Sequence, residues 1–457
     1  MITVSQTAPA STTNDSKPGP TYSFSAIRNV LKVQRDIIGF FDEMATYGDV
    51  ACYRFGPYRS YQFNHPDLIR EVLVTHADRF VRWKVQKRAV GKTIGNGTFN
   101  ADGDFWKRQR KLVQPAFHLR RIQGYADLIA EQVNGLIDGW QERKTYYMAF
   151  EMLKVTMSTI AQIIFGSDVK GHEETIHHAL RVCLVAETRE MTALIPAPDW
   201  LPLLGKFAFR QAVKTFDEMI YGFIRARRTS GVDTGDILAM LLAASDEDNG
   251  ARMTDQQVRD EALTLFMAGY ETGAIALSWT LMLLGQHPEI EQKLAEEVTR
   301  VVGQRPVGLA DLRQLPYPDM VLKEAMRLYP PAFALIREAS EDVTIGGYRL
   351  VKGDLAIVSQ HVMHRDARFF DQPDKFIPER FAPGYEERLP RYAYFPFGGG
   401  PRVCTGQALA TMEAQIVLAT IAQRCRLSLV PGQTFTPAIA TLQRPRNGVQ
   451  MMFKPHQ

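Results

Sequence analysis

The chain has 457 residues, of which 45% are hydrophobic and 23% are charged. This composition is typical of a globular protein with enough apolar material to enclose a large ligand, and it argues against extensive disorder. The formal net charge of +4 is small for this length and argues against a dedicated nucleic-acid binder. The four cysteines are far apart and form no CxxC pair, so a zinc site or a secreted disulfide framework is not expected.

The N-terminal segment, residues 1–20, is rich in Ser, Thr, Pro and Asn and lacks the basic start and apolar run of a signal peptide. We expect a disordered tail over residues 1–20 and a single domain over residues 21–457. The most apolar segment, residues 263–285, carries Glu271, so no transmembrane span is expected. The sequence therefore predicts a cytoplasmic, soluble monomer.

In chain order, residues 51–64 alternate in polarity and predict a β-hairpin, and residues 65–74 predict a short helix. Helical periodicity then dominates residues 105–302. Strand signals return in residues 343–350 and again after Cys425, each with a glycine-containing turn. The predicted fold class is mainly α with minor β, a helical bundle with small sheets.

One predicted helix is unusually long. Thr254 and Gln257 have the spacing of a capping box, and the helical pattern continues to Gln286, before Pro288. At 1.5 Å per residue this helix would be roughly 50 Å long, which is enough to cross the protein. Its middle is apolar on all sides, as expected of a buried helix.

Within this apolar middle lies the sequence Ala268-Gly269-Tyr270-Glu271-Thr272-Gly273. The glycines weaken the helix and leave carbonyl groups free for water, and an acid adjoins an alcohol. In a functional interpretation, Glu271 and Thr272 hold an ordered water and deliver protons. The alternative is structural: the Thr272 hydroxyl bonds back to its own helix and Glu271 pairs with a distant arginine.

Residues 397–406, FGGGPRVCTG, give the strongest signal in the sequence. The glycines permit positive φ angles and close approach of the backbone to a flat partner. A helix pattern follows from Gln407, so Cys404 lies where a helix begins. Backbone N–H groups and the helix dipole there stabilise a thiolate, and Arg402 adds a cation. The loop is therefore suited to present an anionic sulfur to a metal.

The alternatives for this loop are a phosphate-binding loop and a buried structural cysteine. Neither requires the whole pattern. At average residue usage, six specified positions would co-occur by chance on the order of 10⁻⁵ of the time in a chain of this length. These positions are Phe397, Gly398, Gly400, Arg402, Cys404 and Gly406.

The loop resembles the haem-binding loop of the cytochrome P450 family. The resemblance implies a haem b cofactor, with Cys404 as the axial ligand of the iron, Arg402 paired with a haem propionate and Phe397 packed beside the sulfur. A thiolate ligand pushes electron density onto the iron and favours O–O cleavage. The family's long helix carries a similar acid-alcohol motif over the haem, which places Ala268 and Gly269 at the cofactor.

Two further patterns fit this resemblance. Trp106 and Arg110 are four residues apart on one helical face and match the family's propionate-binding pattern. Arg337, which follows the Pro330-Pro331 turn, resembles a further propionate ligand. As an alternative, each could be an ordinary surface or core contact.

Glu324 and Arg327 lie three residues apart and can pair on one helical face. Alone, such a pair is most often a solvated salt bridge. The resemblance assigns both, with Arg380, to a buried ion network that fixes the segment leading to the cysteine loop. This role is structural.

The resemblance implies a monooxygenase that inserts one oxygen atom of dioxygen into an apolar lipid-, terpenoid- or steroid-like substrate. By the same resemblance, residues 89–99, 184–201, 332–336 and 438–442 form the substrate pocket. The alternatives are a peroxide-using, isomerase or dehydratase relative, and a haem carrier or gas sensor. An intact Glu271-Thr272 pair favours the monooxygenase.

The chain has no flavin or iron–sulfur motif, so electrons are expected from a separate ferredoxin- or flavodoxin-type protein. A basic cluster lies in and after the predicted helix of Trp106. Such clusters are most often solvated surface, but the resemblance places this helix at the face where an acidic electron donor docks. The cluster consists of Lys107, Arg108, Lys111, Arg120 and Arg121.

Overall fold

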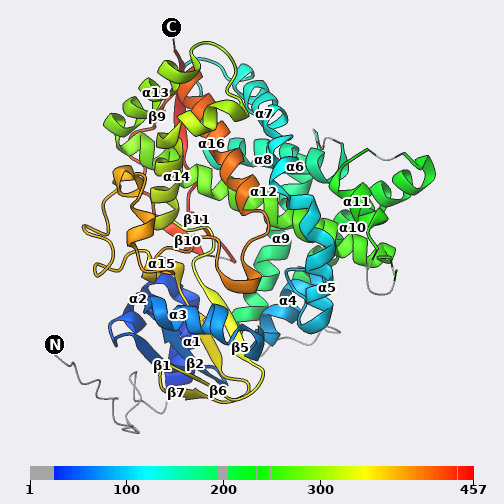
Figure 1. The fold of residues 1–457 in the computed structure, drawn as a ribbon, viewed down its shortest axis with the longest axis vertical. Coiled ribbons are helices and arrows are strands. Elements are labelled where there is room, and N and C mark those ends of the chain that lie inside the picture. Colours follow the sequence, from blue (N-terminus) through cyan, green and yellow to red (C-terminus); the bar gives the residue numbers. More distant parts are fainter. Residues whose placement is uncertain are drawn as a thin grey trace, which may run out of the picture.

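The computed structural model describes residues 25–167, 169, 171–193, 204–232, 234–245, 250, 252–439 and 441–456. The expected tail at residues 1–20 lies outside the described residues. The described part is mainly helical, with a larger sheet at one end of the molecule and smaller sheets elsewhere (Figure 1). The predicted fold class, mainly α with minor β, is confirmed.

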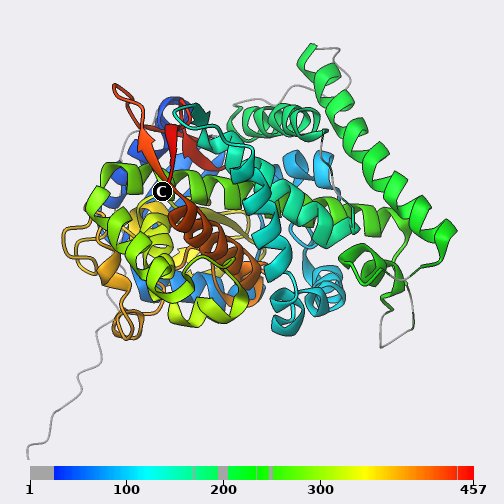
Figure 2. The ribbon, with the colours of Figure 1, turned by 90° about the horizontal axis from the view of Figure 1, so that it is seen from above.

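The helices are α1 Ser25–Arg35, α2 Ile37–Ala45, α3 Pro66–Arg70, α4 Lys84–Ile94, α5 Gly103–Val113, α6 Leu119–Gln123, α7 Ala126–Asp138, α8 Met148–Phe165, α9 Glu173–Thr192, α10 Leu204–Ser230, α11 Ile237–Ala243, α12 Asp255–Gln286, α13 Pro288–Val302, α14 Pro316–Leu328, α15 Gln360–Met363 and α16 Gln407–Arg424. Short 3₁₀ or π turns join them, among them the π turn Glu71–Thr75. Seen from above, α10 lies along one edge of the molecule (Figure 2).

The strands are β1 Val50–Phe55, β2 Tyr58–Phe63, β3 Phe80–Arg82, β4 Thr145–Tyr147, β5 Leu335–Ala339, β6 Val343–Ile345, β7 Tyr348–Leu350, β8 Leu355–Val358, β9 Cys425–Leu429, β10 Pro437–Ile439, β11 Gln443–Pro445 and β12 Gln450–Pro455. They form a five-stranded sheet β1-β2-β8-β5-β3, a three-stranded sheet β4-β12-β9, and the hairpins β6-β7 and β10-β11.

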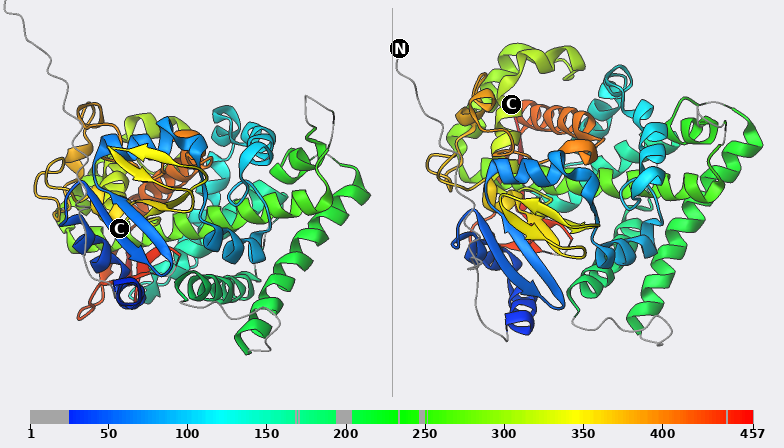
Figure 3. Two further views of the ribbon diagram at one scale, coloured as in Figure 1. Left: turned by 90° about the horizontal axis from the view of Figure 1, so that it is seen from below. Right: turned by 60° about the horizontal axis from the view of Figure 1, so that its bottom comes forward.

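The hairpins predicted at residues 51–64 and 343–350 are both present, as β1-β2 and β6-β7. The N-terminal hairpin is nevertheless part of a larger sheet than expected. β2 pairs in parallel with β8, and β3 pairs with β5, so strands from two distant parts of the chain lie side by side (Figure 3). The short strand β4 also lies within residues 105–302, the region in which helical periodicity was predicted to dominate.

The long helix is α12, and its start is the predicted capping box. The Gln257 backbone N–H donates to the Thr254 hydroxyl at 3.2 Å, and the Thr254 N–H donates to the Gln257 side chain at 2.9 Å. The helix ends at Gln286 as predicted, and it contacts α8, α10, α14 and α16. Many of its residues, from Val258 near its start to Leu284 near its end, are buried in the main core.

Among the described residues, one helix is long and apolar enough to cross a membrane, namely α8. Of this helix, 78% is buried inside the protein, which is typical of a core helix. The sequence reasoning considered residues 263–285 the most apolar segment and did not single out α8. Its apolar surface serves to pack against α12 and α7.

Candidate functional site

The cysteine loop is closed by its own backbone. The Cys404 N–H donates to the Phe397 carbonyl at 3.0 Å, and the Val403 N–H donates to the Gly400 carbonyl at 3.1 Å. α16 begins three residues after Cys404, as predicted. Burial raises the pKa of the Cys404 thiol, while hydrogen bonds from the backbone N–H groups of Gly406 and Gln407 and the charge of Arg110 oppose this rise. The helix start therefore favours the thiolate, against a desolvation penalty.

The Cys404 residue is exposed. Protein atoms nevertheless surround its sulfur closely enough to raise the pKa of the thiol. A thiol that is both accessible and closely surrounded by protein atoms faces a confined space instead of bulk solvent. Such a space is where a prosthetic group can approach the sulfur. The exposed Cys404 thus has a different character from the buried Cys183 and Cys425.

The glycines of the loop permit close approach, but the approach that the structure shows is to protein. Gly398 and Gly400 have φ angles of +74° and +66°. A Cβ on Gly400 would lie 1.8 Å from the carbonyl oxygen of Leu73, in the π turn Glu71–Thr75, and one on Gly399 would lie 2.2 Å from the Tyr392 ring. The expectation that all three glycines serve a flat ligand is corrected: two of them let the loop seat against its own scaffold.

Three of the predicted cofactor residues converge beside this loop. The Arg402 guanidinium lies over the Trp106 ring at 4.4 Å from its centroid, and Arg110 donates a hydrogen bond to the Thr405 hydroxyl. Arg402 also donates to Asp102 at 2.8 Å and to the Ala101 carbonyl at 2.9 Å. α5, which carries Trp106 and Arg110, is thereby tied to both sides of Cys404.

A third arginine joins Arg402 and Arg337, and the sequence reasoning missed it. Arg82 on β3 lies directly opposite Arg337 on β5 in the sheet register. Like charges at opposite positions are destabilising. Burial lowers the pKa of each of these guanidinium groups. The charges of Arg337 and Arg402 lower the pKa of Arg82 further, and the charge of Arg402 does the same for Arg337, while Asp102 opposes the fall in all three.

This cluster tests whether the residues fit the haem that the resemblance implies. Arg82 Nε and Arg402 Nη1 are buried without a hydrogen-bond partner in the described residues. Asp102 is also shared with Lys87, at 2.8 Å. A cluster that is rich in buried cations and short of acceptors matches a ligand with two carboxylates, such as the haem propionates, so the residues fit the cofactor.

The acid-alcohol pair lies on α12 in a different environment. Ala268 is exposed and Thr272 is partly exposed, whereas Tyr270 and Glu271 are buried. Ala268 and Thr272 thus share an accessible face in the middle of a core helix. The Thr272 hydroxyl donates to the Ala268 carbonyl at 2.8 Å, and Glu271 lies 3.9 Å from Arg444. These are the contacts of the structural alternative, and the relay remains a prediction.

The two glycines of this motif face α8. A Cβ on Gly269 would lie 2.7 Å from the Ile160 side chain, and one on Gly273 would lie 3.3 Å from Thr156. α12 is continuous here, and the Tyr270 carbonyl accepts a hydrogen bond from the Thr156 hydroxyl at 2.7 Å. The expectation that the glycines weaken the helix is corrected, because they allow two helices to pack closely. The contact of Gly269 with haem remains a prediction.

The ion network predicted around Glu324 is present. Glu324 and Arg327 form two hydrogen bonds of 2.7 and 2.8 Å, and both side chains are 0% exposed. Arg380 donates to Glu324 at 3.2 Å, and Arg327 also donates to the carbonyls of His364 and Pro373. The network thus joins α14 to the segment that leads to the cysteine loop, and its structural role remains a prediction.

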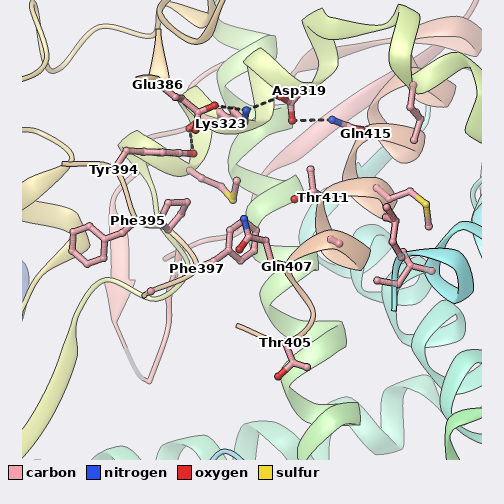
Figure 4. A pocket seen from close by; sticks show the side chains of 18 of the residues that line it. Asp319, Lys323, Glu386, Tyr394, Phe395, Phe397, Thr405, Gln407, Thr411 and Gln415 are labelled. Atoms are coloured by element: carbon pink, nitrogen blue, oxygen red, sulfur yellow. Dashed lines mark hydrogen bonds and ion pairs between the residues drawn. The ribbon is translucent and has the colours of Figure 1, made fainter. Parts of the chain in front are cut away.

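A pocket of about 710 Å³ lies against the outer side of the cysteine loop (Figure 4). On one side, Phe397, Thr405 and Gln407 belong to the loop and to the start of α16. On the other, Lys323 pairs with Asp319 at 2.9 Å and with Glu386. Leu119, which is 63% exposed, also lines the pocket and adjoins the predicted basic cluster. The pocket therefore joins apolar surface to charged surface next to the cysteine.

Comparison with known proteins shows what the chain is similar to. A family model described as "Cytochrome P450" matches residues 18–453. "Cyclooctatin synthase" of Streptomyces melanosporofaciens is 34% identical over 90% of this chain and 89% of its own length. "Cyclooctat-9-en-7-ol 5-monooxygenase" of the same organism is 31% identical over 92% and 91%. "Pentalenene oxygenase" of Streptomyces avermitilis is 29% identical over 92% and 93%.

Proposed function

Because the chain belongs to the cytochrome P450 family, and is therefore a haem-dependent monooxygenase, we propose that it oxidises an apolar, terpenoid-like substrate with electrons from a separate protein. The observation that carries this proposal is the accessible Cys404 just before α16, with the charge of Arg110 beside it. Two of the relatives are named for oxygenation of cyclooctat-9-en-7-ol and of pentalenene. For this chain we propose a terpenoid-like substrate and no particular compound.

Different residues would hold different parts of the cofactor. When bound, haem, here proposed as haem b, supplies the reductive activation of dioxygen. Cys404 would hold the iron, while Trp106, Arg110, Arg402, Arg337 and Arg82 would bind the propionates and fix the orientation of the ring. Phe397, whose carbonyl accepts from the Cys404 N–H, would shield the sulfur from water. Ala268, on the accessible face of α12, would contact the ring.

Thr272 and Glu271 would move protons. The Thr272 hydroxyl faces the accessible side of α12 and can hold a water there, and Glu271 is the adjacent buried acid. Protons delivered in this way let one oxygen atom leave as water instead of both leaving as hydrogen peroxide.

The substitution Thr272→Ala tests this role. We expect the product formed per NAD(P)H consumed to fall and hydrogen peroxide to rise, because the hydroxyl no longer holds the proton-donating water. The matched control is Thr280→Ala, since Thr280 makes the same hydroxyl-to-carbonyl bond two turns along α12, to Ala276 at 2.8 Å. Equal coupling in the two variants would remove Thr272 from proton delivery.

Arg82 gives a prediction about cofactor retention. We expect Arg82→Gln to weaken haem binding by roughly ten- to a hundredfold, which corresponds to the loss of one charge-assisted hydrogen bond of about 1.5–3 kcal/mol. Haem transfer to apomyoglobin measures this loss. Arg79→Gln is the control, because Arg79 lies three residues earlier and makes an exposed contact to Glu341. Retention equal to that of the control would exclude Arg82 from the propionate site.

The electron donor is proposed to dock over the pocket of Figure 4. The basic cluster predicted from the sequence adjoins it, and Lys107, Lys111, Arg120 and Arg121 are exposed. An acidic ferredoxin or flavodoxin would be attracted to this charge, and the exposed Leu119 offers an apolar contact. The docked donor would lie next to the cysteine loop.

The substrate proposal is tested by titrating terpenes, fatty acids and steroids into the haem-loaded protein and recording the spin-state change of the iron. We expect terpenes to give the strongest change. Parts of the predicted pocket wall, residues 194–201 and residue 440, lie outside the described residues. The other predicted walls lie on α4 and the loop after it, on α9, and near β5 and β10.

A further inference from the structure

Glu271 is a buried acid whose ionic partner comes from a distant part of the chain. Its side chain is 8% exposed, and its Oε1 lies 3.9 Å from Nη1 of Arg444, whose side chain is 32% exposed. Burial raises the pKa of Glu271 to about 7, and Arg444 opposes this rise. The pair thus joins the dry interior of α12 to accessible space.

The hairpin β10-β11 presents Arg444 from a fixed backbone. Gln443, the preceding residue, donates its N–H to the Pro331 carbonyl at 2.9 Å. Its carbonyl accepts a hydrogen bond from the Trp279 indole at 3.0 Å, and Trp279 lies two turns along α12 from Glu271. The hairpin is therefore attached to the helix that carries the acid, and these bonds place the backbone of Arg444 beside α12.

Among the described residues, the other titratable groups whose pKa values respond to this pair lie on α9 and α12. Burial and the charges of Arg181 and Arg444 lower the pKa of His177 to about 4, so His177 is neutral at neutral pH. Burial raises the pKa of Glu187 to about 8, to which the charge of Glu271 contributes. Burial also raises the pKa of Cys183 to about 12, so this thiol is neutral.

Tyr270, next to Glu271 in the chain, is fully buried, and burial together with the charge of Glu271 raises the pKa of its hydroxyl. Tyr270 is therefore also neutral. Arg181, on α9, is exposed, and its charge lowers the pKa of His177. Within the described residues, Arg444 is thus the cation that forms an ion pair with Glu271.

We propose that Arg444 is a positioning residue for Glu271: it holds the carboxylate charged at the border of the accessible space, where the acid takes up a proton and passes it toward Thr272. The inference rests on the proposed function, since it names the regulation of the same site. The carboxylate gains one proton from solvent and later releases it to the water held by Thr272. Arg444 keeps its own proton throughout.

The test is Arg444→Gln in the haem-loaded resting enzyme. Infrared difference spectroscopy follows the C=O band of the protonated carboxyl against pH, and Glu271→Gln assigns that band. Removing the cation stabilises the neutral acid relative to the carboxylate, so we expect the midpoint pH to rise by about 1 unit. Arg444→Lys keeps the charge and should restore most of the original midpoint.

Arg181→Gln is the matched control, because it removes a neighbouring cation that forms no ion pair with Glu271 in the described residues. Thermal unfolding of each variant checks that the hairpin is intact. An unchanged midpoint in Arg444→Gln, or an equal shift in Arg181→Gln, would overturn the inference. A raised midpoint with unchanged product per NAD(P)H would leave the pairing in place and contradict the proton-delivery role of Glu271, so the two failures are distinguishable.

Discussion

Replacing Cys404 with serine is expected to abolish substrate oxidation and to remove the carbon monoxide difference band that is characteristic of a haem thiolate. A serine hydroxyl has a far higher pKa than a thiol, so the two backbone N–H groups and Arg110 that favour the thiolate cannot generate an alkoxide. The reduced, carbon monoxide-bound spectrum measures the loss directly. The iron would then carry a neutral ligand that donates less electron density.

The control for this experiment is Cys52→Ser, because Cys52 is a half-buried cysteine of the N-terminal hairpin. We expect Cys52→Ser to keep the original spectrum. A thiolate-type spectrum in Cys404→Ser would refute the assignment of Cys404 as the iron ligand. So would a wild-type protein whose Soret band has the position typical of histidine-ligated haem.

The second large effect is expected from Glu324→Gln. This change leaves Arg327 and Arg380 buried with no acid between them, in a site where Arg327 and Glu324 are 0% exposed. Removing one partner from a buried ion pair costs about 3–5 kcal/mol, a large part of the stability of a typical domain. We expect a lower free energy of unfolding and protein that is purified largely without haem, because the network fixes the segment leading to Cys404.

Glu386→Gln is the matched control for the network. Glu386 pairs with Lys323 on the same helix α14, but the two side chains are 43% and 26% exposed. Removal of such a pair costs about 0–1 kcal/mol. Denaturant unfolding followed by circular dichroism measures both variants. A loss in Glu324→Gln no greater than that in Glu386→Gln would show that the network does not stabilise this segment.

Features encoded over short stretches of sequence were predicted well. The capping box at Thr254 placed the start of α12, the pattern after Gly406 placed α16, and the Gly346-Gly347 turn placed the hairpin β6-β7. The Glu324 network was predicted only through the family resemblance, because its third member, Arg380, is distant in sequence. Local patterns determine caps, turns and helix faces, and these are what a single sequence reveals.

Contacts between distant segments could not be predicted in the same way. Arg82 enters the cluster because β3 pairs with β5, and Arg444 reaches Glu271 because a C-terminal hairpin is attached to α12. Gly400 has its role because the π turn at Leu73 lies against it. No spacing rule in the sequence relates these residues, so each contact became visible only when the folded chain brought its two partners together.

The parallel pairing of β2 with β8 has a consequence for biosynthesis. On the ribosome, the edge of β2 is exposed as soon as the first hairpin forms, yet the strand that covers it is made only when residue 358 has emerged. Cys404 follows soon afterwards. The nascent chain must therefore keep an open sheet edge from aggregating for most of translation, and closure of the sheet is a late step in the synthesis of this chain.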